Sequence, residues 1–268
     1  MRRAGHRVRN QEDFTVRPLT RLLIVVLLAA AVAVSCGKKN KGDDAKEPET
    51  AEEYLERARG SFLDKGKTIK DLNKAIELDD KCVEAYEQRM EVYEARFHKT
   101  KRVKDAKQAI RDCSKLLKLE PESPKAAEWM RKRGYFKLQL KRYDAAIADL
   151  KRSIEKDNWA SKSYQYLADA YRAKGQPKRA AEAYTDAIRC DPTDASLYWN
   201  RCEIYYDLKE YQKVLFDLTK VIEIQPTAKA HLRRADIYRE LGEPHKALED
   251  IQKAKELDPH YDPDAGVW

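Results

Sequence analysis

The chain has 268 residues, of which 37% are charged and only nine are glycine. This length suits one large domain or an extended repeat array, and a Lys-, Glu-, Ala- and Leu-rich composition favours helix over sheet. Half of the net charge of +8 lies in residues 1–35, where six Arg stand against two acidic residues. The remaining Lys and Arg are scattered without interleaved aromatic residues, so no nucleic-acid partner is expected.

The N-terminal segment, residues 1–35, has the features of a signal peptide. Residues 22–34 form an uncharged apolar run of thirteen residues, which is shorter than the about 20 residues that a membrane-spanning helix needs. The following Ala-Val-Ser-Cys sequence, ending at Cys36, resembles the lipobox of bacterial lipoproteins. The resemblance implies acylation of Cys36 and anchoring in the bacterial cell envelope, and Gly37 favours an outer-membrane lipoprotein that faces the periplasm.

The lipobox match is relaxed, because Ala33 stands where Leu is usual. An ordinary signal peptide or an uncleaved anchor is therefore the alternative, with the protein secreted or held at the inner membrane. Residues 36–50 contain almost no apolar side chain. They predict a disordered tether between the anchor and the folded part.

From residue 51 onward the chain repeats itself. The ends of four segments are spaced by 34, 34 and 33 residues, and small residues recur at two further aligned positions. Two antiparallel helices that approach closely need small side chains where they cross, and a Pro after the second helix prevents its continuation. Gly175 and Gly242 fall in the turn between the two helices, where a positive φ is expected. The aligned segment ends are Asn158, Pro192, Pro226 and Pro259, and the small residues are Gly134, Ala168, Cys202 and Ala235 opposite Ala146, Ala180, Val214 and Ala247.

These residues resemble the tetratricopeptide repeat (TPR) family, in which each repeat is a 34-residue helix–turn–helix unit. The resemblance implies an all-α fold, a right-handed superhelical solenoid of about six repeats. About seven extra residues in the second repeat predict longer helices or a larger loop. The expected units are a degenerate repeat 1 at 51–82, an extended repeat 2 at 83–123, repeats 3 to 6 at 124–160, 161–194, 195–227 and 228–261, and a tail at 262–268.

No motif in the sequence supplies chemistry. The histidines have no metal-ligand spacing, and the glycines form no phosphate-binding loop, so we expect no catalytic site, cofactor, metal or small-molecule substrate. Cys190 and Cys202 leave open a disulfide in an exported protein. The alternative is that Cys202 is a buried free thiol at a small-residue position of the repeat.

The resemblance also implies where a partner would bind, because the first helices of TPR units line a concave groove. The aligned positions are acidic in repeat 2, aromatic in the middle and basic in repeat 6, a gradient that an extended peptide could read. The alternative is a solvated acidic face and ordinary packing tyrosines. The residues expected in the groove are Glu84, Glu87, Glu91, Glu94, Arg131, Tyr135, Tyr166, Trp199, Asn200, Tyr206, Lys229 and Arg233.

Three of these groove positions are similar to the clamp by which some TPR domains hold a partner's terminal carboxylate. Asn200, Lys229 and Arg233 match that clamp, but Gln165 and Asp169 stand where Lys and Asn are usual. The sequence thus predicts a membrane-anchored scaffold that binds proteins or peptides and recruits them to the envelope. A structural subunit built permanently into an envelope complex is the second interpretation.

Overall fold

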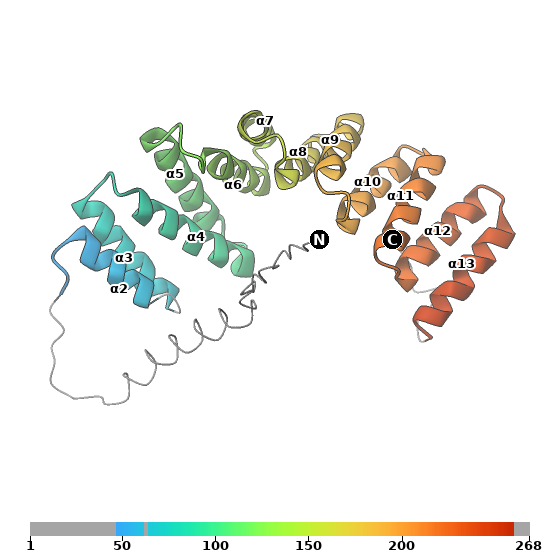
Figure 1. The fold of residues 1–268 in the computed structure, drawn as a ribbon, viewed down its shortest axis with the longest axis horizontal. Helices are drawn as coiled ribbons and strands as arrows, with labels where there is room; N and C mark the ends of the chain where they lie inside the picture. Colours follow the sequence, from blue (N-terminus) through green and yellow to red (C-terminus); the bar gives the residue numbers. More distant parts are fainter. Residues whose placement is uncertain (1–46, 62–63, 260–268) are drawn as a thin grey trace, which may run out of the picture. The chain divides into compact units, whose positions relative to one another are not determined.

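The computed structural model describes residues 47–61 and 64–259, and every regular element in these ranges is an α-helix. The signal segment, Cys36 and the tail 262–268 lie outside the described residues, as does most of the tether. The described helices belong to one compact unit, Pro48–Trp268. They are α2 (Ala51–Gly60), α3 (Lys65–Leu78), α4 (Val83–Thr100), α5 (Val103–Leu119), α6 (Ala126–Gln139), α7 (Tyr143–Lys156), α8 (Ser161–Ala173), α9 (Pro177–Cys190), α10 (Ala195–Asp207), α11 (Tyr211–Ile224), α12 (Ala228–Glu240) and α13 (Pro244–Leu257) (Figure 1).

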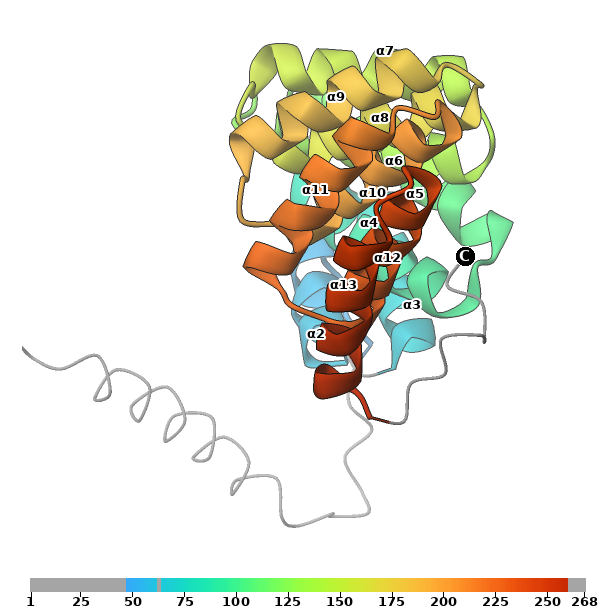
Figure 2. The same ribbon diagram turned by 90° about the vertical axis from the view of Figure 1, so that its right-hand side faces the viewer.

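Each described helix contacts the next one in chain order, and the most extensive contacts join the helices two by two. One such pair lies in each of the six expected repeat ranges, and Figure 2 shows the last pair, α12 and α13, nearest to the viewer. The extra residues of repeat 2 lengthen its helices, since α4 has 18 residues and α5 has 17. The architecture confirms the all-α TPR fold. Among the described helices, none is both long and apolar enough to cross a membrane.

Close helix crossings explain the small residues of the repeat. A Cβ atom added to Gly134 would lie only 2.7 Å from Cγ of Leu150 on the partner helix. The aligned Ala168 is fully buried, as are Ala180 and Val214 on the opposing helices. A larger side chain at such a crossing would force the two helices apart, since protein interiors are close-packed.

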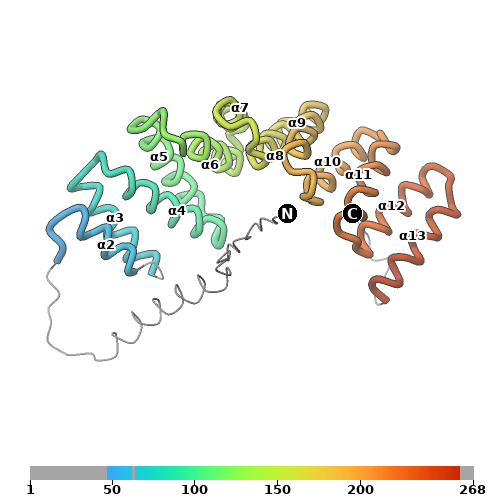
Figure 3. Tube along the Cα trace, viewed as in Figure 1, coloured from blue at the N-terminus to red at the C-terminus, as the bar shows by residue number. Residues whose placement is uncertain are grey.

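Left-handed residues make the turns inside the repeats, where the trace reverses direction (Figure 3). Gly175 and Gly242 have φ angles of 75° and 74°, which confirms the expectation for both glycines. Lysines fill the same position in other repeats: Lys141 and Lys209 each have a φ of 59°, and Lys101 has 54°. A side chain makes this conformation costly.

Buried arginine–aspartate pairs connect adjacent repeats. Arg201 on α10 donates to Asp217 on α11 through Nε (3.0 Å) and Nη2 (2.6 Å). Its Nη1 donates to Oγ1 of Thr185, 2.8 Å away on the second helix of the preceding repeat. Arg201 is 8% exposed and Asp217 is fully buried. One side chain therefore links two helices of its own repeat to the repeat before it.

The same link recurs along the chain but is absent from repeat 4. The corresponding positions there, 34 residues before Arg201 and Asp217, are the apolar Leu167 and Ala183, both buried. The other links are Arg89 with Asp112 and Asn73, Arg133 with Asp149 and Ser114, and Arg234 with Asp250 and Thr219.

Candidate functional site

The candidate site is the first-helix face, by which we mean the expected partner-binding side chains on α4, α6, α8, α10 and α12. Helices α6 and α8, the first helices of repeats 3 and 4, contact each other directly as well as through α7. The side chains of this face fall into an acidic, an aromatic and a cationic group. The acidic group lies on α4 of repeat 2, whereas the aromatic and cationic groups each draw on two repeats.

Three of the four glutamates of the acidic group form ion pairs with basic side chains that the sequence analysis did not single out: Glu84 with Arg59, Glu87 with Lys125 and Glu94 with Lys132. Glu87 accepts hydrogen bonds from Nζ of Lys125 at 2.9 and 3.0 Å and from Nε1 of Trp129 at 3.2 Å. Glu94 accepts one from Nζ of Lys132 at 2.9 Å. Glu91 is exposed. This group therefore joins repeat 2 to repeat 3, and its surface is less acidic than the four glutamates suggest.

The aromatic group centres on Tyr135 and Tyr166, whose ring centroids lie 4.9 Å apart at an interplanar angle of 40°. His98 also stacks on Tyr135, with the ring centroids 5.7 Å apart at an interplanar angle of 27°. Burial raises the pKa of both tyrosines, although each ring retains an exposed part. Arg131, one helical turn before Tyr135, lies 3.6 Å from Glu128. Half-exposed rings on adjacent helices form a surface on which a partner side chain can stack.

The cationic group pairs two basic side chains with two aromatic rings. Nζ of Lys229 lies 5.1 Å from the ring centre of Trp199, and Cζ of Arg233 lies 5.3 Å from that of Tyr206. Lys229 is exposed, whereas Arg233 is 2% exposed. Burial lowers the pKa of Arg233 to about 10. Asn200, next to Trp199, is half-buried.

A cavity of about 220 Å³ opens beside this cationic group. Trp199 and Val221 give it an apolar wall, and Gln225, Thr227 and Lys229 supply polar groups. The cavity lies where α10 begins, α11 ends and α12 begins. Apolar walls with a few convergent polar groups are typical of ligand sites.

Two residues at the clamp positions are held by other groups. The hydroxyl of Tyr184 donates a hydrogen bond to Asp169 within repeat 4. Oε1 of Gln165 accepts a hydrogen bond from Nζ of Lys162 at 3.0 Å. Neither side chain supplies the Lys or Asn that a carboxylate clamp carries there, so the likeness extends to Asn200, Lys229 and Arg233 alone.

The disulfide that the sequence left open between Cys190 and Cys202 is not formed in the structure, in which both residues are free thiols. Cys190 ends α9, and its Sγ lies 3.6 Å from the backbone oxygen of Asn158. Cys202 lies in the middle of α10, 2% exposed, in a cluster with Val214 and Leu218. Burial raises the pKa of Cys202 to about 12. The two thiols belong to different packing environments, and the structure has the alternative, a buried free thiol at Cys202.

Within the described residues, no group of three or more His, Cys, Asp or Glu side chains is arranged to hold a metal ion. The ionisable side chains of the first-helix face form ion pairs, cation–π contacts and stacks. The arrangement suits recognition of a partner's side chains.

The chain belongs to the tetratricopeptide repeat family. Models described as "Tetratricopeptide repeat" match residues 102–161 and 228–261, and one described as "TPR repeat" matches residues 168–209. The family is one of protein-interaction scaffolds and is generally non-catalytic. A curated relative, the Protein SGT1 homolog of Oryza sativa subsp. japonica, is 42% identical over 55 residues. This match covers 20% of the chain and 15% of the relative's length.

Solved TPR structures resemble the chain over most of their own length. MamA is 25% identical with a TM-score of 0.52, covering 58% of this chain and 90% of MamA. PilW, described as a widely conserved type IV pilus biogenesis factor, is 15% identical with a TM-score of 0.58, and the match covers 80% of this chain and 96% of PilW. YrrB, described as a TPR protein with an unusual peptide-binding site, is 19% identical with a TM-score of 0.54, and the match covers 71% of this chain and 93% of YrrB.

Proposed function

We propose that the protein is a membrane-anchored scaffold of the bacterial envelope that binds an extended protein segment along the first-helix face. The observation that carries the proposal is the cavity beside Trp199 and Lys229. It has an apolar wall and an exposed cation, and the paired rings of Tyr135 and Tyr166 lie on the first helices of the two preceding repeats. Aromatic side chains and Arg dominate the binding energy of such surfaces.

The comparisons support the scaffold role by analogy. YrrB shares the fold and is described by its peptide-binding site, and PilW shares it and is described as a pilus biogenesis factor. The anchor rests on the sequence around Cys36. Growth on labelled palmitate tests it: we expect label on the wild-type chain and none on Cys36→Ser, and equal labelling of both would refute acylation at this residue.

Site-specific crosslinking tests the binding face. A photoreactive amino acid replaces Trp199 in one full-length variant and the exposed Arg152 on α7 in a matched control. We expect position 199 to crosslink a partner that position 152 does not. Trp199→Ala should then weaken the affinity for that partner by about thirtyfold, since a central aromatic contributes about 2 kcal/mol.

Equal crosslinking at both positions, or an unchanged affinity of Trp199→Ala, would argue against the first-helix face. Crosslinks confined to Arg152, with the chain always recovered in one large assembly, would favour the second function, a structural subunit of an envelope complex. That alternative has support in the exposed Phe216, which is 57% exposed on the second helix α11.

A further inference from the structure

The turns inside repeats 2 to 4 concentrate positive charge. The three turn segments, residues 97–107, 137–145 and 171–179, contain twelve Lys and Arg against only Asp105 and Asp144. The connections between repeats have the opposite balance. Residues 76–86, 117–126, 154–163 and 188–197 contain ten acidic residues against six basic ones. In repeats 2 to 4 the positive charge is thus concentrated at one end of the helix pairs.

Contacts between repeats bring these turns together. His98, near the end of α4, stacks on Tyr135 of α6, and Lys174 in the turn of repeat 4 forms an ion pair with Asp144 in the turn of repeat 3. The turn of repeat 2 thus lies against α6 of repeat 3, and the turn of repeat 4 contacts the turn of repeat 3. We name the three turns together the basic turn edge.

Most cations of the basic turn edge are exposed and unneutralised. Nine of them are exposed and form no ion pair with any carboxylate in the described part of the chain. In contrast, Lys137 and Arg172 pair with Asp149 and Glu203. The nine are Lys99, Lys101, Arg102, Lys104, Lys107, Lys141, Arg142, Lys178 and Arg179.

Two of these lysines hold a costly backbone conformation. Lys101 and Lys141 have φ angles of 54° and 59° in the turn where repeat 4 has Gly175. Glycine adopts this conformation without the steric penalty that a Cβ incurs. Residues in sparsely populated conformations cluster at functional positions. The left-handed backbone holds these two charges at the tip of their turns.

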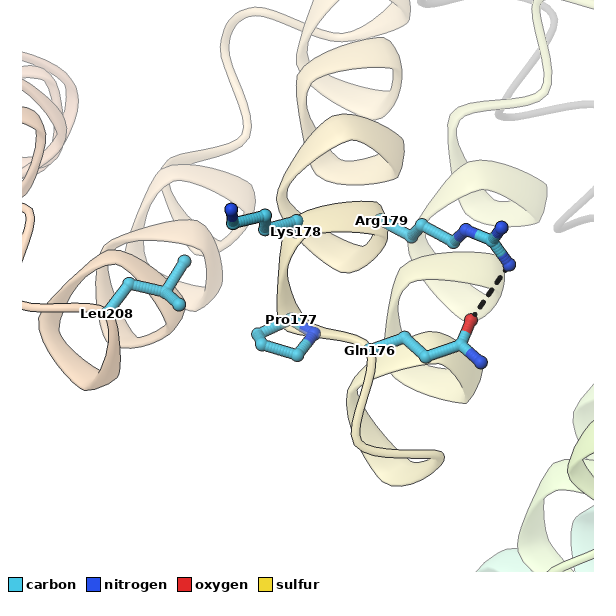
Figure 4. A pocket seen from close by; sticks show the side chains of 5 residues that line it. All are labelled: Gln176, Pro177, Lys178, Arg179 and Leu208. Atoms are coloured by element: carbon cyan, nitrogen blue, oxygen red, sulfur yellow. Dashed lines mark hydrogen bonds between the residues drawn. The ribbon is translucent and has the colours of Figure 1, made fainter.

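Apolar groups accompany the cations. Val103, between Arg102 and Lys104, is 54% exposed. Where the turn of repeat 4 meets the end of α10, Pro177 and Leu208 line a cavity of about 450 Å³ together with Lys178 and Arg179. Figure 4 shows Lys178 extending toward the side of Leu208, while Arg179 points away and donates to Gln176.

The combination of exposed cations and apolar side chains favours one of two polyanionic partners, a membrane surface over single-stranded nucleic acid. Single-stranded nucleic acid is bound by exposed aromatic rings on which bases stack, but in the turn segments Phe97 and Tyr171 are buried and Tyr143 is half-buried. A bilayer surface offers phosphate groups to lysines and an apolar boundary to Val, Pro and Leu. We propose that the basic turn edge binds a membrane surface that carries anionic, phosphate-bearing lipid headgroups. This inference goes beyond the proposed partner binding and does not require acylation of Cys36.

Vesicle binding tests the proposal on the full-length chain carrying Cys36→Ser, so that acylation plays no part. We expect tighter binding to phosphatidylcholine vesicles that contain phosphatidylglycerol than to phosphatidylcholine alone, and weaker binding as salt is raised. Arg102→Gln, Lys104→Gln, Lys141→Gln and Lys178→Gln combined should raise the dissociation constant for the anionic vesicles about tenfold or more, because each cation near such a surface contributes to binding.

A matched variant removes four exposed charges from the second helices: Lys118, Lys151, Arg152 and Lys255, each changed to Gln. It should bind within about twofold of the parent, because these cations lie away from the turns. The N-terminal arginines are present in all variants, so their contribution to vesicle binding is the same in each. Equal losses in both variants, or no loss in the turn variant, would overturn the proposal. So would tighter binding of polyuridylic acid than of anionic vesicles through the same four residues.

Discussion

Asp169 shows that the role of a side chain depends on the groups that it contacts in the folded protein. In sequence it stands at a clamp position on α8, where an acidic group would repel a partner's carboxylate. In the structure its carboxylate accepts a hydrogen bond from Tyr184. Burial raises the pKa of Asp169 and also that of Tyr184. The ionised carboxylate is therefore tolerated at a cost, and its role lies within repeat 4.

This pair predicts a specific pH dependence for Asp169→Asn. The folded-state pKa of Asp169 is raised, so its contribution to stability is greatest below the ordinary pKa of a carboxyl and falls as pH rises through the raised value. Asn keeps an acceptor for Tyr184 and removes the cost of burying a charge. We expect the variant to be more stable than the wild type at pH 7, by about 1 kcal/mol, and to lose this advantage in acid.

Urea unfolding of both proteins between pH 4 and pH 8 measures the difference. The exposed Asp207 on α10 offers a control, because Asp207→Asn should leave the difference nearly constant over that range. An advantage of Asp169→Asn that grows as the pH falls would contradict the argument.

At this scale the sequence predicted the positions of the first-helix face but not their partners. Tyr135 with Tyr166 and Lys229 with Trp199 lie together as an aligned repeat suggests. The pairing of Glu87 with Lys125 was not predicted, because Lys125 precedes the first periodic residue of repeat 3 and has no equivalent elsewhere. Spacing along one helix shows which residues share a face, whereas ion pairs across repeats depend on how two helices pack.

At the scale of the elements, the turns inside the repeats contain both a prediction that the structure confirms and a feature that the sequence did not reveal. Gly175 and Gly242 were expected to have positive φ angles and do so. The lysines at the same position were not expected, because a side chain there is unfavourable and only the repeat alignment places them. Repeat 2 shows a further limit: its extra residues could have formed a loop, and helix packing instead extends α4 and α5.

The turn geometry predicts that Lys209→Gly stabilises the protein. Lys209 has a φ of 59° and lies outside the basic turn edge. Removing Cβ relieves a cost of about 1–2 kcal/mol, and the greater freedom of Gly in the unfolded chain offsets about half of it. We therefore expect a gain of about 0.5–1 kcal/mol in the free energy of unfolding.

Thermal or urea unfolding of Lys209→Gly tests this, with Gly175→Lys as the reverse substitution at φ 75°. The reverse variant should lose about 1 kcal/mol. If both variants changed stability in the same direction, backbone strain would not be the dominant effect at this turn.

At the scale of the whole molecule, stability comes from a succession of contacts between neighbouring repeats. Each described helix contacts the next helix in chain order, and α6 and α8 also contact each other directly. In such a solenoid each interface contributes separately to stability. The buried Arg–Asp links are features of these interfaces. Their signal was present in the sequence as Arg and Asp sixteen residues apart in repeats 3, 5 and 6, but charged residues are usually assigned to the surface.

The absence of this link from repeat 4 yields a prediction about the interface between repeats 4 and 5. Arg201→Leu leaves the carboxylate of Asp217 buried without its partner, which should cost about 3–5 kcal/mol. Adding Asp217→Ala reproduces the Leu167 and Ala183 arrangement of repeat 4 and removes the stranded charge. We expect the double variant to recover most of the loss, because replacing a buried ion pair by apolar groups is often close to neutral.

Urea unfolding gives the free energies, and amide hydrogen exchange shows where the loss falls. Exchange in Arg201→Leu should accelerate on both sides of the interface, in α9 and α11, since Nη1 of Arg201 also donates to Thr185. Repeat 1 should exchange as in the wild type, because each repeat contacts only its neighbours. If the double variant were as unstable as Arg201→Leu, the interface would depend on the hydrogen bonds of Arg201 themselves, and the apolar arrangement of repeat 4 would not be interchangeable with the ion pair.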